Sequence, residues 1–101
     1  MTRVAITGAA GRMGRSLVEA CCATEGLILA AAVERPGKTG IGADAGDIAG
    51  IGAAQVVIAD DLAAVVDDFD VLVDFTRPEV TLANLAVCRE AGRRMVVGTT
   101  G

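Results

Sequence analysis

A glycine-rich turn between an apolar strand and a helical segment is the feature that most constrains this chain. The turn reads Gly8-Ala9-Ala10-Gly11-Arg12-Met13-Gly14 and follows the apolar run Val4-Ala5-Ile6. The first backbone N–H groups of a helix have no partner within the helix, and the helix dipole adds partial positive charge there. The sequence therefore predicts a loop that holds the diphosphate of a nucleotide, formed by Gly8, Ala9, Ala10, Gly11, Arg12 and Met13.

The spacing of these glycines differs from the G-x-G-x-x-G pattern, because the turn is one residue longer. Glycine-rich turns also serve as tight connections, and the turn alone leaves that alternative open. In the functional interpretation, Gly11 lacks a side chain because the diphosphate must approach the backbone at that position.

An acidic residue stands where a dinucleotide-binding fold requires one. Glu34 ends the apolar run Leu27–Val33 and lies twenty residues beyond Gly14. A carboxylate at the tip of the second strand binds ribose hydroxyls, whereas the guanidinium of Arg35 suits the 2′-phosphate of NADPH. The pair predicts a site for NADH or NADPH; the alternative is that both residues merely end a strand at the surface.

The remaining pattern alternates strands with helices. Helices are expected over Arg12–Thr24, from Asp60 or Asp61 to Val66, and from a Thr76 N-cap, within the capping box Thr76-Arg77-Pro78-Glu79, to Ala91. Strands are expected over Arg3–Thr7, Leu27–Val33, Val56–Ala59, Val71–Phe75 and Met95–Val97. This alternation predicts an α/β fold, a Rossmann-type doubly wound parallel sheet of strand order 3-2-1-4-5.

Two more motifs fall at the carboxyl ends of the predicted strands, where ligands bind in such folds. Phe75 is expected to pack against the cofactor, Thr76 to cap a helix or bind the ligand, and Asp74 to be hydrogen-bonded into the loops. Backbone groups at Gly98, Thr99 and Thr100 are expected to hold a nicotinamide carboxamide, with an ordinary turn as the alternative.

The segment from Pro36 to Gly52 contains six glycines and is expected to be a mobile surface loop or a flap over the adenosine end. The chain stops at Gly101, within the last of these motifs. We therefore expect residues 1–101 to be the N-terminal dinucleotide-binding domain of a longer protein.

Composition excludes several other function classes. The net charge of −4 disfavours a nucleic-acid surface, and no run approaches the length of a membrane span. The chain has no histidine and no tyrosine, and its three cysteines have no metal-ligand spacing. We expect a cytoplasmic protein with no metal site, in which any proton transfer would have to come from a carboxylate, a cysteine, Lys38 or another chain segment.

The chain resembles dihydrodipicolinate reductase, a family of lysine and diaminopimelate biosynthesis. The resemblance rests on Val4–Arg15, Glu34-Arg35, Gly42–Gly46, Asp70–Pro78 and Val96–Gly101, and spans the whole chain. It implies a homotetramer of two-domain subunits that transfers hydride from NADH or NADPH to a cyclic dicarboxylate of the dihydrodipicolinate type. The catalytic histidine and lysine of the family have no matching position here, so the fragment alone is expected to be inactive.

Two alternatives remain open. An extended short-chain dehydrogenase has a similar opening turn, but it requires a Tyr–Lys pair and a different motif after the fourth strand. A nucleotide-sensing module of the same fold, without catalysis, is consistent with the absence of histidine.

Overall fold

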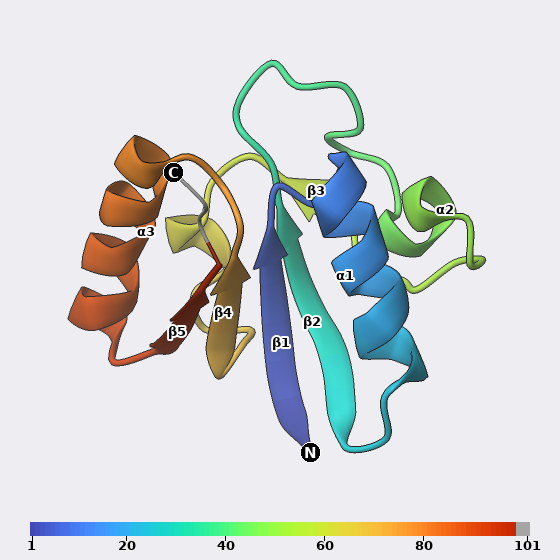
Figure 1. The fold of residues 1–101 in the computed structure, drawn as a ribbon, viewed down its shortest axis with the longest axis horizontal. Coiled ribbons are helices and arrows are strands. Elements are labelled where there is room, and N and C mark those ends of the chain that lie inside the picture. The colour runs from blue at the N-terminus through green and yellow to red at the C-terminus, as the bar shows by residue number, and fades with distance from the viewer. Residues whose placement is uncertain (99–101) are drawn as a thin grey trace.

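Five parallel strands form one sheet in the order β3-β2-β1-β4-β5 (Figure 1). The computed structural model of the protein describes residues 1–98. The strands are β1 Thr2–Thr7, β2 Leu27–Val33, β3 Ile58–Ala59, β4 Val71–Asp74 and β5 Arg94–Val97. The predicted fold class and strand order are confirmed.

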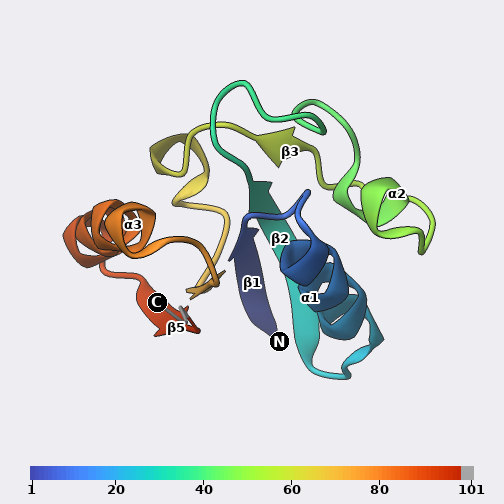
Figure 2. The ribbon, with the colours of Figure 1, turned by 45° about the horizontal axis from the view of Figure 1, so that its top comes forward.

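Helices cover both faces of this sheet (Figure 2). On one face α1 (Arg12–Ala23) and α2 (Ala45–Ala49) pack against β1 and β2, whereas α3 (Pro78–Ala91) and the 3-10 turn η1 (Ala63–Val65) cover the other. Each face has its own hydrophobic cluster, so the sheet is a middle layer between two cores.

The apolar strands follow from this layering. Along β1, Val4 and Ile6 face the α1 core and Ala5 faces the α3 core, so both faces of the strand are apolar. Ile6 and Leu72 are almost fully buried. Removal of one such side chain from water contributes about 1.5–3 kcal/mol to folding.

Helix α1 forms because its small and apolar residues recur at helical spacing. Gly14, Val18 and Cys21 are its buried residues and lie on one face of the helix. Burial raises the pKa of the Cys21 thiol, so this cysteine is a neutral core residue.

Several predicted boundaries differ from the structure. The β3 strand is only Ile58–Ala59, two residues shorter than expected, and the predicted short helix is a 3-10 turn with Leu62 at its N-cap. Helix α3 has Arg77 rather than Thr76 at its N-cap, so the prediction of Thr76 as the cap is wrong. The reason is local: the Thr76 amide and hydroxyl both donate to the carboxylate of Asp74, two residues earlier.

The glycine-rich segment from residue 36 to 52 is not a simple loop, because it contains α2. Asp44 is the N-cap of α2, and its carboxylate accepts hydrogen bonds from the amides of Asp47, Ala54 and Val56 at 2.8–3.0 Å. These amide donors, first that of Ala54, hold the pKa of Asp44 below its usual value. One side chain thus organises a segment that composition alone marks as loop.

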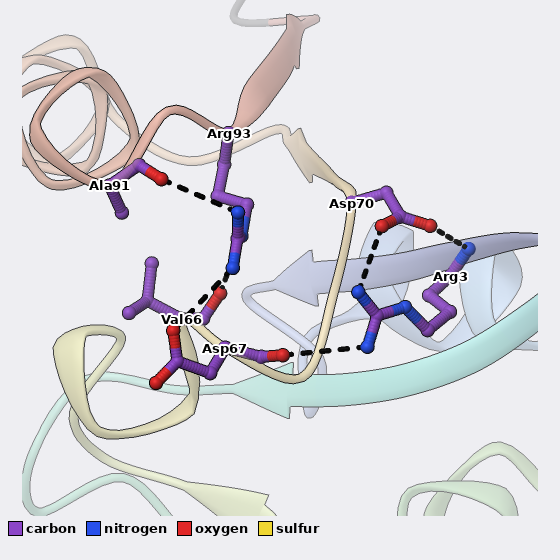
Figure 3. A network of polar contacts seen from close by, with 6 residues as sticks. All are labelled: Arg3, Val66, Asp67, Asp70, Ala91 and Arg93. Carbon is purple, nitrogen blue, oxygen red and sulfur yellow. Dashed lines mark hydrogen bonds and ion pairs between the residues drawn. The ribbon is translucent and has the colours of Figure 1, made fainter.

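The start of β1 is tied to the start of β4 by a polar network at the end of the sheet away from the strand tips (Figure 3). Asp70 accepts from the Arg3 backbone amide and from its guanidinium, both at 2.9 Å. Arg93 donates to the carbonyl of Val66 at 2.8 Å and pairs with Asp67. The hydrogen bond from the Arg3 side chain lowers the pKa of Asp70, and that of Arg3 is raised.

Among residues 1–98, no helix has both the length and the apolar character needed to cross a membrane.

Candidate functional site

A cleft of about 710 Å³ lies at the carboxyl ends of the strands, where α1 and α3 both begin. In Figure 1 the arrows of β1, β2 and β4 point to this end of the molecule. Of the residues predicted to bind a cofactor, those lining the cleft are Gly8, Gly11, Arg12, Met13, Glu34, Arg35, Phe75 and Thr76. The fold therefore brings together segments that are far apart in the sequence.

The glycine-rich turn uses several of its own amides for internal hydrogen bonds. The Ala9 N–H donates to the carbonyl of Val33 at 3.2 Å, and the Gly11 N–H donates to Gly8 at 3.0 Å. The Ala10 N–H donates to a carboxylate oxygen of Glu34 at 3.1 Å. Ala9 is fully buried, and neither Ala9 nor Ala10 lines the cleft.

The amides that remain for a ligand belong to the first turn of α1. Gly11 is the N-cap residue, and no side chain caps the helix within residues 1–98. The N–H groups of Arg12, Met13 and Gly14 therefore lack an intrahelical acceptor, and their residues line the cleft. An anion here would meet free donors and the positive end of the helix dipole.

The three glycines of the turn differ in how strictly the structure requires glycine at each position. Gly8 has a φ of 69°, in the left-handed region that favours glycine. A Cβ at Gly14 would overlap the carbonyl of Gly8, so Gly14 is required for the helix to pack on the turn. Gly11 has an ordinary φ of −79°, and a Cβ there would lie 3.3 Å from the Gly8 oxygen. This contact is tight but is not an overlap, so the fold requires glycine less strictly at Gly11 than at Gly14.

Glu34 and Arg35 lie at the tip of β2, as predicted, but their environments differ. Glu34 is only 7% exposed, and its two carboxylate oxygens accept from the amides of Ala10 and Arg35. Arg35 is exposed at the rim of the cleft. The acid is therefore part of the turn, and the cation beside it is accessible.

At the tip of β4, the buried Asp74 organises the loop into α3. Its carboxylate accepts from the amide and hydroxyl of Thr76 and, at 3.0 Å, from the side-chain amide of Asn84. The prediction that Asp74 is hydrogen-bonded into the loops is confirmed. The network fixes the position of Phe75, whose ring is 37% exposed in the cleft.

Gly98 lies directly behind the Phe75 ring, and a Cβ at this position would overlap ring carbons. Its amide donates to the carbonyl of Asp74 at 2.8 Å. The ends of β4 and β5 are thus in contact beside the Phe75 ring. Thr99 and Thr100, also predicted to bind the cofactor, lie outside the described residues.

The cleft also contains residues that the sequence pattern did not single out as ligands. Lys38 follows the Glu34-Arg35 pair, Asp60 and Asp61 follow β3, and further residues come from the first turns of α3. The α3 residues are Arg77, Glu79, Val80, Ala83, Asn84 and Val87. Only the position of α3 beside the strand tips reveals them, although the carboxyl-end rule could have directed attention to this helix start.

No group of three or more metal-ligating side chains is gathered anywhere in the part of the chain that the structure describes. Burial raises the pKa of the Cys88 thiol, which lies in the α3 core. The chemistry that this arrangement offers is the binding of an anionic, partly flat ligand.

A doubly wound parallel sheet with a bare helix start over a glycine turn defines a class: a nucleotide-binding domain of the Rossmann type. Over residues 2–101 the chain matches the family described as "Dihydrodipicolinate reductase, N-terminus". The chain belongs to this family.

Solved structures agree with this assignment. A dihydrodipicolinate reductase from Paenisporosarcina sp. TG-14, determined with dipicolinate bound, is 25% identical with a TM-score of 0.77, over 100% of this chain and 38% of that one. An amine dehydrogenase from Mycobacterium smegmatis has the same identity and TM-score, over 95% of this chain and 29% of that one.

An aspartate semialdehyde dehydrogenase from Candida albicans, determined with NADP, is 15% identical with a TM-score of 0.76. The match covers 99% of this chain and 30% of the dehydrogenase chain, and at this identity it shows the fold alone. The chain thus spans between 29% and 38% of the length of these three structures.

Proposed function

We propose that this chain is the N-terminal dinucleotide-binding domain of a 4-hydroxy-tetrahydrodipicolinate reductase and that it binds NADH or NADPH in the cleft at the strand tips. In the full-length protein this domain would present the cofactor to a cyclic dicarboxylate in lysine and diaminopimelate biosynthesis. The family resemblance also leads us to propose a cytoplasmic homotetramer.

The observation that carries this proposal is the pairing of Gly11 with the uncapped start of α1. The amides of Arg12 and Met13 would hold the diphosphate, and the missing side chain at Gly11 gives the phosphate oxygens access to the backbone.

Other residues at the strand tips fit the remaining parts of a dinucleotide. Glu34 and Arg35 lie where the adenosine ribose would bind, at the tip of the strand next to β1. Phe75 and Gly98 lie on the opposite side of β1, where the nicotinamide would bind. A bound reduced nicotinamide supplies the hydride; the residues described here hold and orient it, and the proposal places no proton transfer in this chain.

The test is Gly11→Val, assayed by titration calorimetry with NADH and with NADPH. The valine side chain would fill the space over the first-turn amides, so we expect no detectable binding of either cofactor. Circular dichroism and thermal unfolding should show that the variant remains folded, since a Cβ at Gly11 meets only the Gly8 oxygen at 3.3 Å.

Arg89→Gln provides a matched surface control, because Arg89 lies in the last turn of α3 and does not line the cleft. This variant should bind both cofactors as the unmodified protein does. Unchanged affinity in folded Gly11→Val would contradict the proposed phosphate site.

A further inference from the structure

We propose that Lys38 acts with Arg35 as a second cation for the 2′-phosphate of NADPH, and that this pair makes the cleft select NADPH over NADH. The inference rests on the proposed function and deepens it, because the glycine turn alone would bind both cofactors equally. It concerns the rim of the cleft beyond the tip of β2.

The carboxylate at this rim, that of Glu34, is hydrogen-bonded to the glycine-rich turn. Glu34 is 7% exposed, and its carboxylate oxygens accept from the Ala10 amide at 3.1 Å and the Arg35 amide at 3.0 Å. Both hydrogen bonds fix the carboxylate against the glycine turn. It therefore presents little surface toward a group bound farther out along the rim.

The two cations stand on one short turn. The Lys38 amide donates to the Arg35 carbonyl at 3.1 Å, and Gly37 between them has a φ of 85°. This closure turns the chain back on itself and keeps both residues in the wall of the same cleft. Within residues 1–98 neither side chain forms an ion pair, so both are available to an anion.

The opposing charges explain why one cation is insufficient. Asp60 and Asp61 follow the neighbouring strand β3 and line the same cleft, and both are exposed. The Asp61 carboxylate accepts from the Ala63 amide at 3.1 Å, yet it still disfavours an anion nearby. A phosphomonoester carries a charge of about −1.5 to −2 at neutral pH. Arg35 alone would leave much of that charge unmatched, and Lys38 supplies the second positive charge.

The test is Lys38→Gln, which keeps most of the side-chain length and removes the charge. Titrations of the protein with NADPH, NADH, 2′-phospho-AMP and AMP measure each dissociation constant. We expect about tenfold weaker binding of NADPH and of 2′-phospho-AMP, the effect of one lost charge-assisted contact at a partly exposed site. Binding of NADH and AMP should change by less than about twofold.

Two further variants sharpen the result. Lys38→Arg retains the charge and should restore the preference for NADPH, whereas Arg89→Gln removes a cation outside the cleft and should leave all four constants unchanged. Equal affinities of Lys38→Gln and the unmodified protein for NADPH would overturn this inference while leaving the phosphate site intact. An equal loss for NADPH and NADH would also overturn it, since Lys38 would then contact a part that both cofactors share. Failure of the unmodified protein to bind any of the four probes would refute the proposed function itself.

Discussion

At the scale of single residues, the glycines of the first turn separate folding from binding. Gly14 is required by the protein interior, because a Cβ there would overlap the backbone of Gly8. Gly11 has no such requirement and faces the cleft. Two glycines three residues apart therefore differ in what the fold requires of them, which the sequence pattern does not distinguish.

Gly14→Ala should destabilise the protein by about 1–3 kcal/mol or more, because the added methyl group must push α1 away from the glycine turn. The free energy of unfolding from urea denaturation measures this effect. Ser16→Ala, at an exposed position of the same helix, should change it by less than about 0.5 kcal/mol. Equal stabilities of the two variants would show that the turn can relax around a side chain.

At the scale of elements, carboxylates that accept several hydrogen bonds set the positions of segments that hydrophobic packing alone would leave loose. Asp44 gathers three amides around the start of α2, and Asp74 holds the loop between β4 and α3. Asp70 links the start of β4 to that of β1, as Figure 3 shows. Each of these carboxylates accepts more than one hydrogen bond, so each connects several backbone or side-chain groups at once.

The Asp70 link gives a prediction about acid stability. Its pKa is lowered in the folded protein, chiefly by the hydrogen bond from Arg3, so its contribution to stability is present above the ordinary pKa of about 4. That contribution is lost as the pH falls through the lower folded-state pKa. Asp70→Asn should therefore reduce the difference in unfolding free energy between neutral pH and about pH 3.

Urea denaturation at the two pH values measures this difference. Glu25→Gln, which removes an exposed acid for which the structure shows no hydrogen-bond or ion-pair partner within residues 1–98, should leave it unchanged. If the unfolding free energy falls by the same amount between the two pH values in Asp70→Asn and in the unmodified protein, this ion pair does not contribute to the pH dependence of stability.

At the scale of the whole molecule, the two helical layers position one binding edge. The helices α1 and α3 lie on opposite faces of the sheet, and both begin at the carboxyl ends of the strands. Their first turns therefore flank the same cleft, one with free amides and the other with Arg77 and Asn84. In the proposed function the cofactor binds at this edge, and a substrate would have to reach the nicotinamide end, beside Phe75.

The full-length protein should oxidise NADH or NADPH when given a cyclic substrate of the dihydrodipicolinate type. The loss of reduced-nicotinamide absorbance measures this reaction. Gly11→Val should abolish this activity because the cofactor no longer binds. Cofactor binding without turnover of such a substrate would favour a nucleotide-sensing module. Turnover of a simple alcohol or ketone would favour a short-chain dehydrogenase.

The sequence by itself determined the order of the five strands and the two long helices, the parallel sheet and the place of the first turn. These depend on local signals: apolar runs of strand length, a glycine turn before a helix, and Gly92 at the end of α3, where φ is 72°. The short range of such signals is the reason that they can be read from neighbouring residues.

Only the tertiary structure decided what the individual polar groups do. Glu34 was predicted to bind a ribose, and only the structure shows that its carboxylate also accepts a hydrogen bond from the amide of Ala10, twenty-four residues earlier in the chain. A segment expected to be a loop contains α2, because the carboxylate of its N-cap residue Asp44 also accepts from the amides of Ala54 and Val56, farther along the chain. Hydrogen-bonding groups choose among all donors and acceptors that folding brings near, and this choice depends on contacts between distant segments that no local pattern records.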